Sequence, residues 1–186
     1  AGDEVAIGAM TTLADLEKSP VVQAIAGGAI CRCIRDIKNS DEKKATIGGV
    51  VAVKAPFSVV LPVLMSLRVD VVLEGKGRMN LVDYIPCPPM REMVSQVVIA
   101  KEEVYTAFAA YRKLPTDEPY LTGAVAALDD EWRVVVGGRR GADGKGNGRT
   151  GKRGPSGQRG IGLCQLRHLF RAGTAEPDCR HGPQAD

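Results

Sequence analysis

The chain has 186 residues, of which 44% are hydrophobic, and a formal net charge of +3. This is enough apolar material for the core of one ordinary domain or of two small ones. Only 4% of the residues are aromatic, with Trp132 the single tryptophan, which argues against an aromatic platform for stacking nucleic-acid bases. The longest apolar stretch, 57–67, is too short for a membrane span, which needs about 20 residues.

The charge is divided unevenly along the chain. Residues 138–186 hold ten Lys and Arg against four Asp and Glu, whereas residues 1–137 hold 15 against 18. Twelve of the 22 glycines also lie in those last 49 residues. Because each glycine loses much backbone entropy on folding and adds no side chain to a core, we expect the segment 139–186 to be disordered.

The first half of the chain predicts short helices after one strand. Residues 4–10 read as a strand, and the hydroxyls of Thr11-Thr12 predict the cap of a helix from Leu13. Ser19-Pro20 is typical of a second helix start, with Gly27-Gly28 weakening its middle. The polar residues 35–44 predict an exposed loop.

The segment 45–53, ATIGGVVAV, sets two glycines among β-branched residues. We predict a turn in which no side chain covers the backbone N–H groups. Such bare amides suit the phosphates of a dinucleotide, to which the Thr46 hydroxyl adds a further donor. From the pentapeptide alone, a tight bend between strands is the favoured interpretation, and only the ordered flanking segments described below reverse that preference.

The following segments predict a buried helix from Pro62, a strand over 69–73, a turn at 75–77 and a return strand or helical turn over 79–85. A proline-rich break at 87–90 indicates a subdomain seam near residue 86. Beyond it, four strand-like runs at 93–100, 104–113, 121–128 and 132–138 favour an antiparallel sheet. No helical pattern follows to cover that sheet.

We therefore expect an α+β fold in three parts. Residues 1–86 form a mixed or antiparallel sheet with flanking helices, 87–138 begin a small antiparallel sheet, and 139–186 form the glycine- and arginine-rich tail.

Five segments follow one another along the chain: IGAMTTLADLEKSP, ATIGG, PFSVVLPVLMSLRVDVVLEG, YRKLPTDEPYLTGAVAA and WRVVVGGRRG. In this order they resemble the flavin-binding domain of the molybdenum hydroxylases, the family of xanthine dehydrogenase and carbon monoxide dehydrogenase. The resemblance spans most of residues 5–138 and identifies its first part as the second FAD-binding subdomain.

The resemblance implies an FAD-binding oxidoreductase component of the cytoplasm. Its FAD takes electrons from iron–sulfur clusters, which a molybdenum centre supplies, and passes them to NAD or another acceptor. Iron–sulfur and molybdopterin subunits are the implied partners. The ring of the cofactor performs the redox step, so we expect no catalytic residue in this chain. By the resemblance, the residues that line FAD are Ala45, Thr46, Gly48, Gly49 and Ser58.

The chain departs from the family pattern at polar positions. Val50 stands where the family usually has asparagine, Val59 where it has aspartate, and residues 42–44 replace an arginine–asparagine pair. The family's N-terminal glycine-rich phosphate loop has no counterpart here. Each lost hydrogen bond removes roughly 0.5–1.5 kcal/mol, so we expect weak or absent FAD binding and no activity of the chain alone.

The basic tail has three interpretations. It is an RGG-like segment that binds nucleic acid, a solvated terminus without a partner, or the product of a frame shift near codon 140 in GC-rich DNA. The last is favoured, which makes a nucleic-acid partner the less favoured hypothesis. The competing function is nevertheless a non-enzymatic α+β scaffold whose tail binds RNA or an acidic partner.

The five cysteines are an odd number and predict no disulfide framework. Cys31 and Cys33 are one residue apart with no second pair, so we read them as partly buried thiols rather than metal ligands. We expect no metal site.

Overall fold

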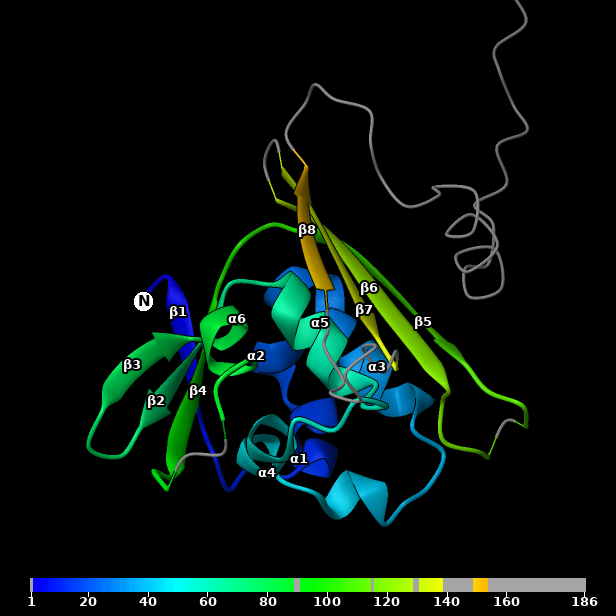
Figure 1. Cartoon of the computed structure of the whole chain (residues 1–186), viewed down its shortest axis with the longest axis horizontal. Coiled ribbons are helices and arrows are strands. Elements are labelled where there is room, and N and C mark those ends of the chain that lie inside the picture. The colour runs from blue at the N-terminus through cyan, green and yellow to red at the C-terminus, as the bar shows by residue number, and fades with distance from the viewer. Residues whose placement is uncertain (1, 89–90, 115, 129–130, 139–148, 154–186) are drawn as a thin grey trace, which may run out of the picture.

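A computed structural model describes residues 2–88, 91–114, 116–128, 131–138 and 149–153 (Figure 1). Helices occupy the first half of the chain and strands dominate the second. In chain order the elements are β1 Glu4–Gly8, α1 Leu13–Lys18, α2 Pro20–Gln23, the 3-10 helix η1 Ile25–Gly28, α3 Ala29–Asp36, the 3-10 helix η2 Glu42–Lys44, α4 Ile47–Val53, α5 Val60–Ser66, β2 Val69–Leu73, β3 Gly77–Asn80, α6 Leu81–Tyr84, β4 Val94–Ala100, β5 Tyr105–Tyr111, β6 Leu121–Leu128, β7 Glu131–Gly137 and β8 Arg149–Arg153.

The strands form two four-stranded sheets. The first sheet has the order β1-β4-β2-β3 and the second β5-β6-β7-β8. Every described strand pair is antiparallel. With helices packed between the sheets, this confirms the expected α+β fold class (Figure 1).

The helical layer covers one face of each sheet. In the first sheet Val71 and Val97 are paired and fully buried, whereas their neighbours Val72 and Gln96 face outward. In the second sheet α5 packs on β6 and β7, and α3 packs on β5. Since successive side chains of a strand alternate between faces, each sheet has one inner and one outer face.

One hydrophobic core joins the two sheets. It includes Val71 of β2, Leu64 of α5 and Ala126 of β6, all 0% exposed. Every residue of α5 is buried, and the hydroxyl of Ser66 donates to the carbonyl of Val63 at 2.8 Å. The helix therefore lies at the centre of the molecule with its one polar side chain satisfied internally.

The helix starts near the N-terminus follow the sequence signals. The Thr12 hydroxyl accepts a hydrogen bond from the Asp15 amide at 3.2 Å and caps α1. Pro20 stands in the first turn of α2, as predicted. The chain then kinks instead of continuing, because Ala26, Gly27 and Gly28 all have positive φ angles. The pair of glycines thus divides the expected second helix into α2, η1 and α3.

Three expectations need correction or adjustment. Strand β4 pairs with β1 and β2, so the sheets divide after residue 100 and not near residue 86. The second sheet is covered on its inner face by helices that precede it in the chain, α3 and α5. Residues 149–153, expected to lack regular structure, pair with β7 as strand β8. The other residues of 139–186, and with them the hypotheses about the tail, lie outside the described residues.

Within the described residues, no helix is long and apolar enough to cross a membrane.

Candidate functional site

The predicted phosphate-binding turn at 45–49 is the start of helix α4. Thr46 is the N-cap, and its hydroxyl accepts a hydrogen bond from the Gly49 amide at 3.2 Å. Gly48 and Gly49 are the second and third helical residues. The helix forms despite two glycines and a run of valines because Ile47, Gly48 and Val51 are buried against the core.

The expectation of uncovered amides is wrong for this turn. The Ile47 amide donates to the Thr11 carbonyl and the Gly48 amide to the Ala9 carbonyl, each at 2.9 Å. The Leu13 amide donates in turn to the Ala45 carbonyl at 2.9 Å. The segment after β1 thus runs beside the start of α4, and its carbonyls accept hydrogen bonds from the amides that we expected to be uncovered.

Gly48 is required for packing. A Cβ atom at this position would lie 2.5 Å from the Cβ of Ala9 and 2.9 Å from the Ala9 carbonyl oxygen. Because real Cβ atoms do not approach so closely, only glycine lets the segment after β1 lie against α4. At Gly49 the nearest atom to such a Cβ is the Thr46 hydroxyl at 3.1 Å, and this glycine is exposed.

The structure brings four of the five predicted residues together. Ala45 and Gly49 are exposed beside the half-buried Thr46, with Gly48 buried beneath them. Ser58 follows the other end of α4, where its hydroxyl accepts a hydrogen bond at 3.2 Å from the amide of Leu61 in the first turn of α5. Both hydroxyls of the predicted set therefore hold helix starts.

The residues that depart from the family pattern are engaged in the fold. Val59 is buried in the core and Val50 packs against it. The Lys43 ammonium binds the Glu17 carboxylate at 2.8 Å, and Lys44 binds Asp41 at 2.7 Å. Apolar and paired side chains thus occupy the positions where the resemblance would place polar contacts.

The contact with Lys43 changes the acidity of Glu17. The hydrogen bond from Lys43 lowers the pKa of Glu17 below its ordinary value of 4.5, and Arg35, 3.6 Å from the same carboxylate, lowers it further. This cluster ties η2 to α1 and α3, so it fixes the loop that precedes Ala45.

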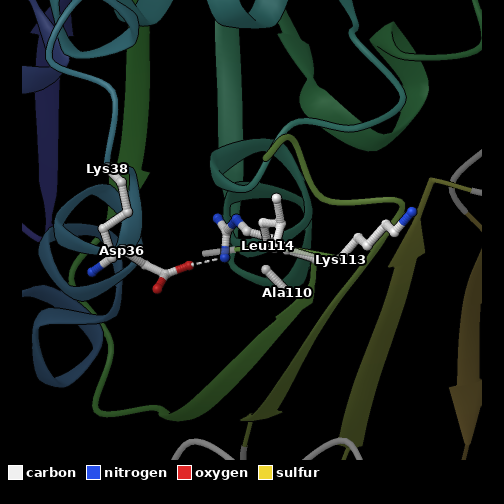
Figure 2. Close-up of a pocket in the computed structure, with 6 residues that line it drawn as sticks. Asp36, Lys38, Ala110, Lys113 and Leu114 are labelled. Atoms are coloured by element: carbon white, nitrogen blue, oxygen red, sulfur yellow. Dashed lines mark hydrogen bonds and ion pairs between the residues drawn. The ribbon is translucent and has the colours of Figure 1, made fainter. Parts of the chain in front are cut away.

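A cavity of about 350 Å³ lies between the end of α3 and the end of β5 (Figure 2). At its centre the Arg112 guanidinium binds the Asp36 carboxylate at 2.7 Å. The lining residues are Asp36, Lys38, Ala110, Arg112, Lys113 and Leu114. None of the five predicted site residues is among them. The sequence signal for the cavity is the tripeptide Tyr111-Arg112-Lys113, but Asp36 is 76 residues away from Arg112.

A second polar feature on the inner face of this sheet is the hydroxyl of Thr122. Its side chain is buried, and the hydroxyl oxygen has no hydrogen-bond partner among the described residues. Thr122 pairs with Ala110 of the cavity wall on one side and with Gly137 on the other. Gly137 in turn adjoins the Pro56 carbonyl in the turn that leads to Ser58.

Lys54 forms a contact that sequence reasoning missed. Its ammonium donates to the carbonyls of Tyr84 and Cys87, at 2.9 and 2.8 Å, and lies 4.1 Å from the centre of the Tyr84 ring. Partial burial lowers the pKa of Lys54. The contact holds the end of α4 against α6. No local sequence pattern predicts it, because Tyr84 and Cys87 lie 30 and 33 residues from Lys54.

The thiols of the helical layer are structural. Cys31 and Cys33 are buried and reduced, with hydrogen bonds to the carbonyls of Leu16 at 3.4 Å and Ile30 at 3.1 Å. Burial raises the pKa of both thiols, which disfavours the reactive thiolate. Among the described residues, no group of three or more His, Cys, Asp or Glu side chains is arranged to hold a metal ion.

Comparison with known proteins gives one curated relative in two strains. Over 137 residues the chain is 31% identical to the uncharacterized protein YgfM of Escherichia coli K12, covering 71% of this chain and 50% of that protein. YgfM of E. coli O157:H7 gives the same values. The chain thus spans about half the length of the curated relatives it matches. No family model matches the chain.

Solved structures share its fold. Carbon monoxide dehydrogenase from Hydrogenophaga pseudoflava, in a form lacking the Mo-pyranopterin moiety, superposes with a TM-score of 0.64 and 22% identity. Quinoline 2-oxidoreductase from Pseudomonas putida 86 gives a TM-score of 0.64 at 15% identity. Each match covers 74% of this chain and 53% of the other. CO dehydrogenase from Oligotropha carboxidovorans follows at 0.62 and 20%.

Proposed function

We propose that this chain is part of an FAD-binding component of a molybdenum-hydroxylase-type oxidoreductase. The observation that carries the proposal is the fold, shared over 74% of the chain with a CO dehydrogenase and a quinoline 2-oxidoreductase. The ordered segments that resemble the family span most of residues 5–138. Bound FAD supplies the redox chemistry, accepting electrons and passing them to NAD or another acceptor.

The described residues fit FAD on one side only. Ala45 and Gly49 are exposed on either side of Thr46, but their amides already donate to the Glu42 carbonyl and to the Thr46 hydroxyl oxygen. The O–H of Thr46 is the donor that a phosphate can approach. Gly48 contributes no free donor, because its amide is bonded to Ala9. The surface can therefore form one wall of a cofactor site, and we expect the remaining contacts to come from other polypeptide.

From this division we propose that the chain is inactive alone. Val50 and Val59 pack in or against the core and provide no polar contact to a ribose or phosphate. Iron–sulfur and molybdopterin subunits, as proposed partners, would deliver electrons to the flavin. In our proposal the chain positions one side of the cofactor, and the assembled complex performs the reaction.

Binding of FAD to the full chain tests this proposal. We expect weak quenching of flavin fluorescence, with half-saturation above about 10 µM, because several hydrogen bonds of the family site are lacking. A stoichiometric yellow protein on purification would contradict the one-sided site. No detectable binding even in the presence of the partner subunits would contradict the function itself.

Substitution at Gly49 gives a charge-specific test. Gly49 is the third helical residue after the Thr46 cap, so either Gly49→Glu or Gly49→Gln completes a capping box and favours the helix. Only the glutamate places a negative charge beside the proposed phosphate surface. We expect Gly49→Glu to bind FAD at least about fivefold more weakly than Gly49→Gln. The reason is that the negative carboxylate repels the phosphates of FAD, whereas the neutral amide does not. Equal affinities would remove Gly49 from the site.

A further inference from the structure

The four edges of the two sheets differ in length and charge. Strands β1, β3 and β8 have four or five residues each, and each contains at least one Glu, Lys or Arg. Strand β5 has seven residues with the sequence YTAFAAY and contains no charge, proline or glycine. Proteins protect exposed edges with short strands, charges or prolines. Strand β5 has none of these devices.

The main chain of β5 is open on the side away from β6. The Thr106 carbonyl faces that side, since it accepts a hydrogen bond from Arg32 at 3.2 Å. Main-chain groups alternate between the two sides of a strand with a period of two residues. The N–H and C=O groups of Phe108 and Ala110 therefore point to the same edge as those of Thr106. Among the described residues no element pairs with this edge, and β5 runs along the margin of the fold in Figure 1.

Arg32 closes only a small part of the edge. Its side chain is exposed and bonds to the Thr106 and Gly27 carbonyls. A carbonyl oxygen has two lone pairs and accepts a second hydrogen bond, so Arg32 need not leave for a strand to pair here. Among the residues that the structure describes, no acceptor outside the sheet is bonded to the N–H groups of Thr106, Phe108 and Ala110.

The sequence of β5 is nearly symmetric about Phe108. Tyr105 mirrors Tyr111, Ala107 mirrors Ala109, and Thr106 mirrors the similarly small Ala110. An antiparallel pair of identical strands related by a twofold axis sets each residue opposite its mirror position. We propose that β5 pairs with β5 of a second copy of this chain, centred on Phe108, to form one continuous sheet.

The proposed register matches the open groups of the edge. Phe108 would pair with the same residue of the second copy, and Thr106 with Ala110, and these are the residues whose main chain faces outward. The side chains of Tyr105 and Tyr111 would meet across the two strands on the outer face, where aromatic pairs stabilise antiparallel strands. Small residues separate the aromatic rings of β5, so the strand's own side chains leave room for a second strand.

A pair of edge strands buries less area than a standard interface of about 1,600 Å². We therefore expect a reversible dimer with a dissociation constant on the order of 10–100 µM. The inference does not depend on the proposed function, because it uses only the edge and its sequence.

Sedimentation equilibrium of the full chain over a range of concentrations tests the proposal. We expect a monomer–dimer equilibrium for the wild-type chain. In parallel, the amides of the peptide 105–111 should exchange at least about threefold more slowly at concentrations where the dimer is populated, since pairing protects them. The peptide 131–137 of β7 should show no such concentration dependence.

Two variants distinguish edge pairing from other contacts. Ala110→Pro removes an edge-facing N–H, which an edge strand tolerates, and should weaken the dimer at least about tenfold. Ala109→Lys, on the outer face of β5, should do the same, whereas Val134→Lys, on the same face of the central strand β7, should leave the dimer unchanged. Circular dichroism checks that each variant is folded.

The proposal would be overturned by a wild-type chain that stays monomeric to about 1 mM, which lies well above the expected dissociation constant. It would also be overturned by a dimer that Val134→Lys disrupts while Ala110→Pro does not. That second result would indicate stacking of the outer faces instead of pairing at the edge.

Discussion

The outer faces of the two sheets are built in opposite ways. On the first sheet the Arg78 guanidinium reaches Asp70 of β2 at 2.6 Å and Glu4 of β1 at 2.5 Å. Strand β4 lies between β2 and β1, and its outward residue Val98 is only 6% exposed. The ion pairs of Arg78 with Asp70 and Glu4 therefore cross the outer face of this sheet, in which the apolar Val98 is nearly buried.

The second sheet has no such cover on strands β5 to β7. From the strand register, one row of its outer face contains Tyr105, Ala127 and Trp132, and the next contains Ala107, Val125 and Val134. Tyr105 is 88% exposed and Trp132 59%. No charged side chain of these three strands stands in either row.

The two sheets therefore differ in what covers the outer face. Ion-paired side chains cross the outer face of the first sheet, whereas the outer face of β5 to β7 is apolar. Large contiguous apolar patches are rare on soluble monomers, and the outer face of β5 to β7 has this apolar character. The following variants test whether the two sheets, despite this contrast, behave as one folding unit.

The largest effect is expected for Leu64→Ala in α5. Leu64 is 0% exposed in the core shared by both sheets, so the variant should lose about 3 kcal/mol of unfolding free energy through lost burial and a cavity. Urea unfolding followed by far-UV circular dichroism and by Trp132 fluorescence, which reports on the second sheet, should give coincident transitions. The near-isosteric Leu64→Met should cost less than about 1.5 kcal/mol. A first sheet that remains folded when the second has melted would show two independent units.

A smaller, pH-dependent effect is expected for Lys43→Met. Lys43 lowers the folded-state pKa of Glu17, so the pair stabilises the fold above pH 4.5 and this contribution disappears as the pH falls through the lowered pKa. At pH 7 the variant should be less stable by roughly 0.5–1 kcal/mol. Thermal unfolding between pH 2 and pH 7 should show the two stability curves converging in acid. A difference that stays constant would assign the loss to packing.

The smallest effects on stability compare the outer faces directly. Arg78→Met should lower the melting temperature slightly and increase the binding of a hydrophobic dye, because it uncovers Val98. Trp132→Thr, on the open face, should change stability by less than about 0.5 kcal/mol and reduce dye binding. Opposite changes in dye fluorescence support the contrast between the faces. The same direction in both variants would contradict it.

The local chemistry of the chain predicts much of its secondary structure. Thr12 caps a helix, Pro20 begins one and the glycines at 27 and 28 interrupt one, because each of these preferences is a property of a few neighbouring residues. The same reasoning found strand β2 and the strands β5, β6 and β7 of the second sheet, but not β8. The α+β class follows from this pattern, with no knowledge of distant contacts.

The tertiary structure decided what those elements do. Gly48 and Gly49 look like a bare phosphate-binding turn in the sequence, yet Ala9 and Thr11 lie against that turn and accept its hydrogen bonds. Strand β4 joins the first sheet across a proline-rich break, and α5 covers a sheet that comes after it in the chain. These outcomes depend on contacts between residues tens of positions apart, whose partners no local pattern specifies. The sequence determined the elements, and long-range packing determined which donors, faces and edges remain open.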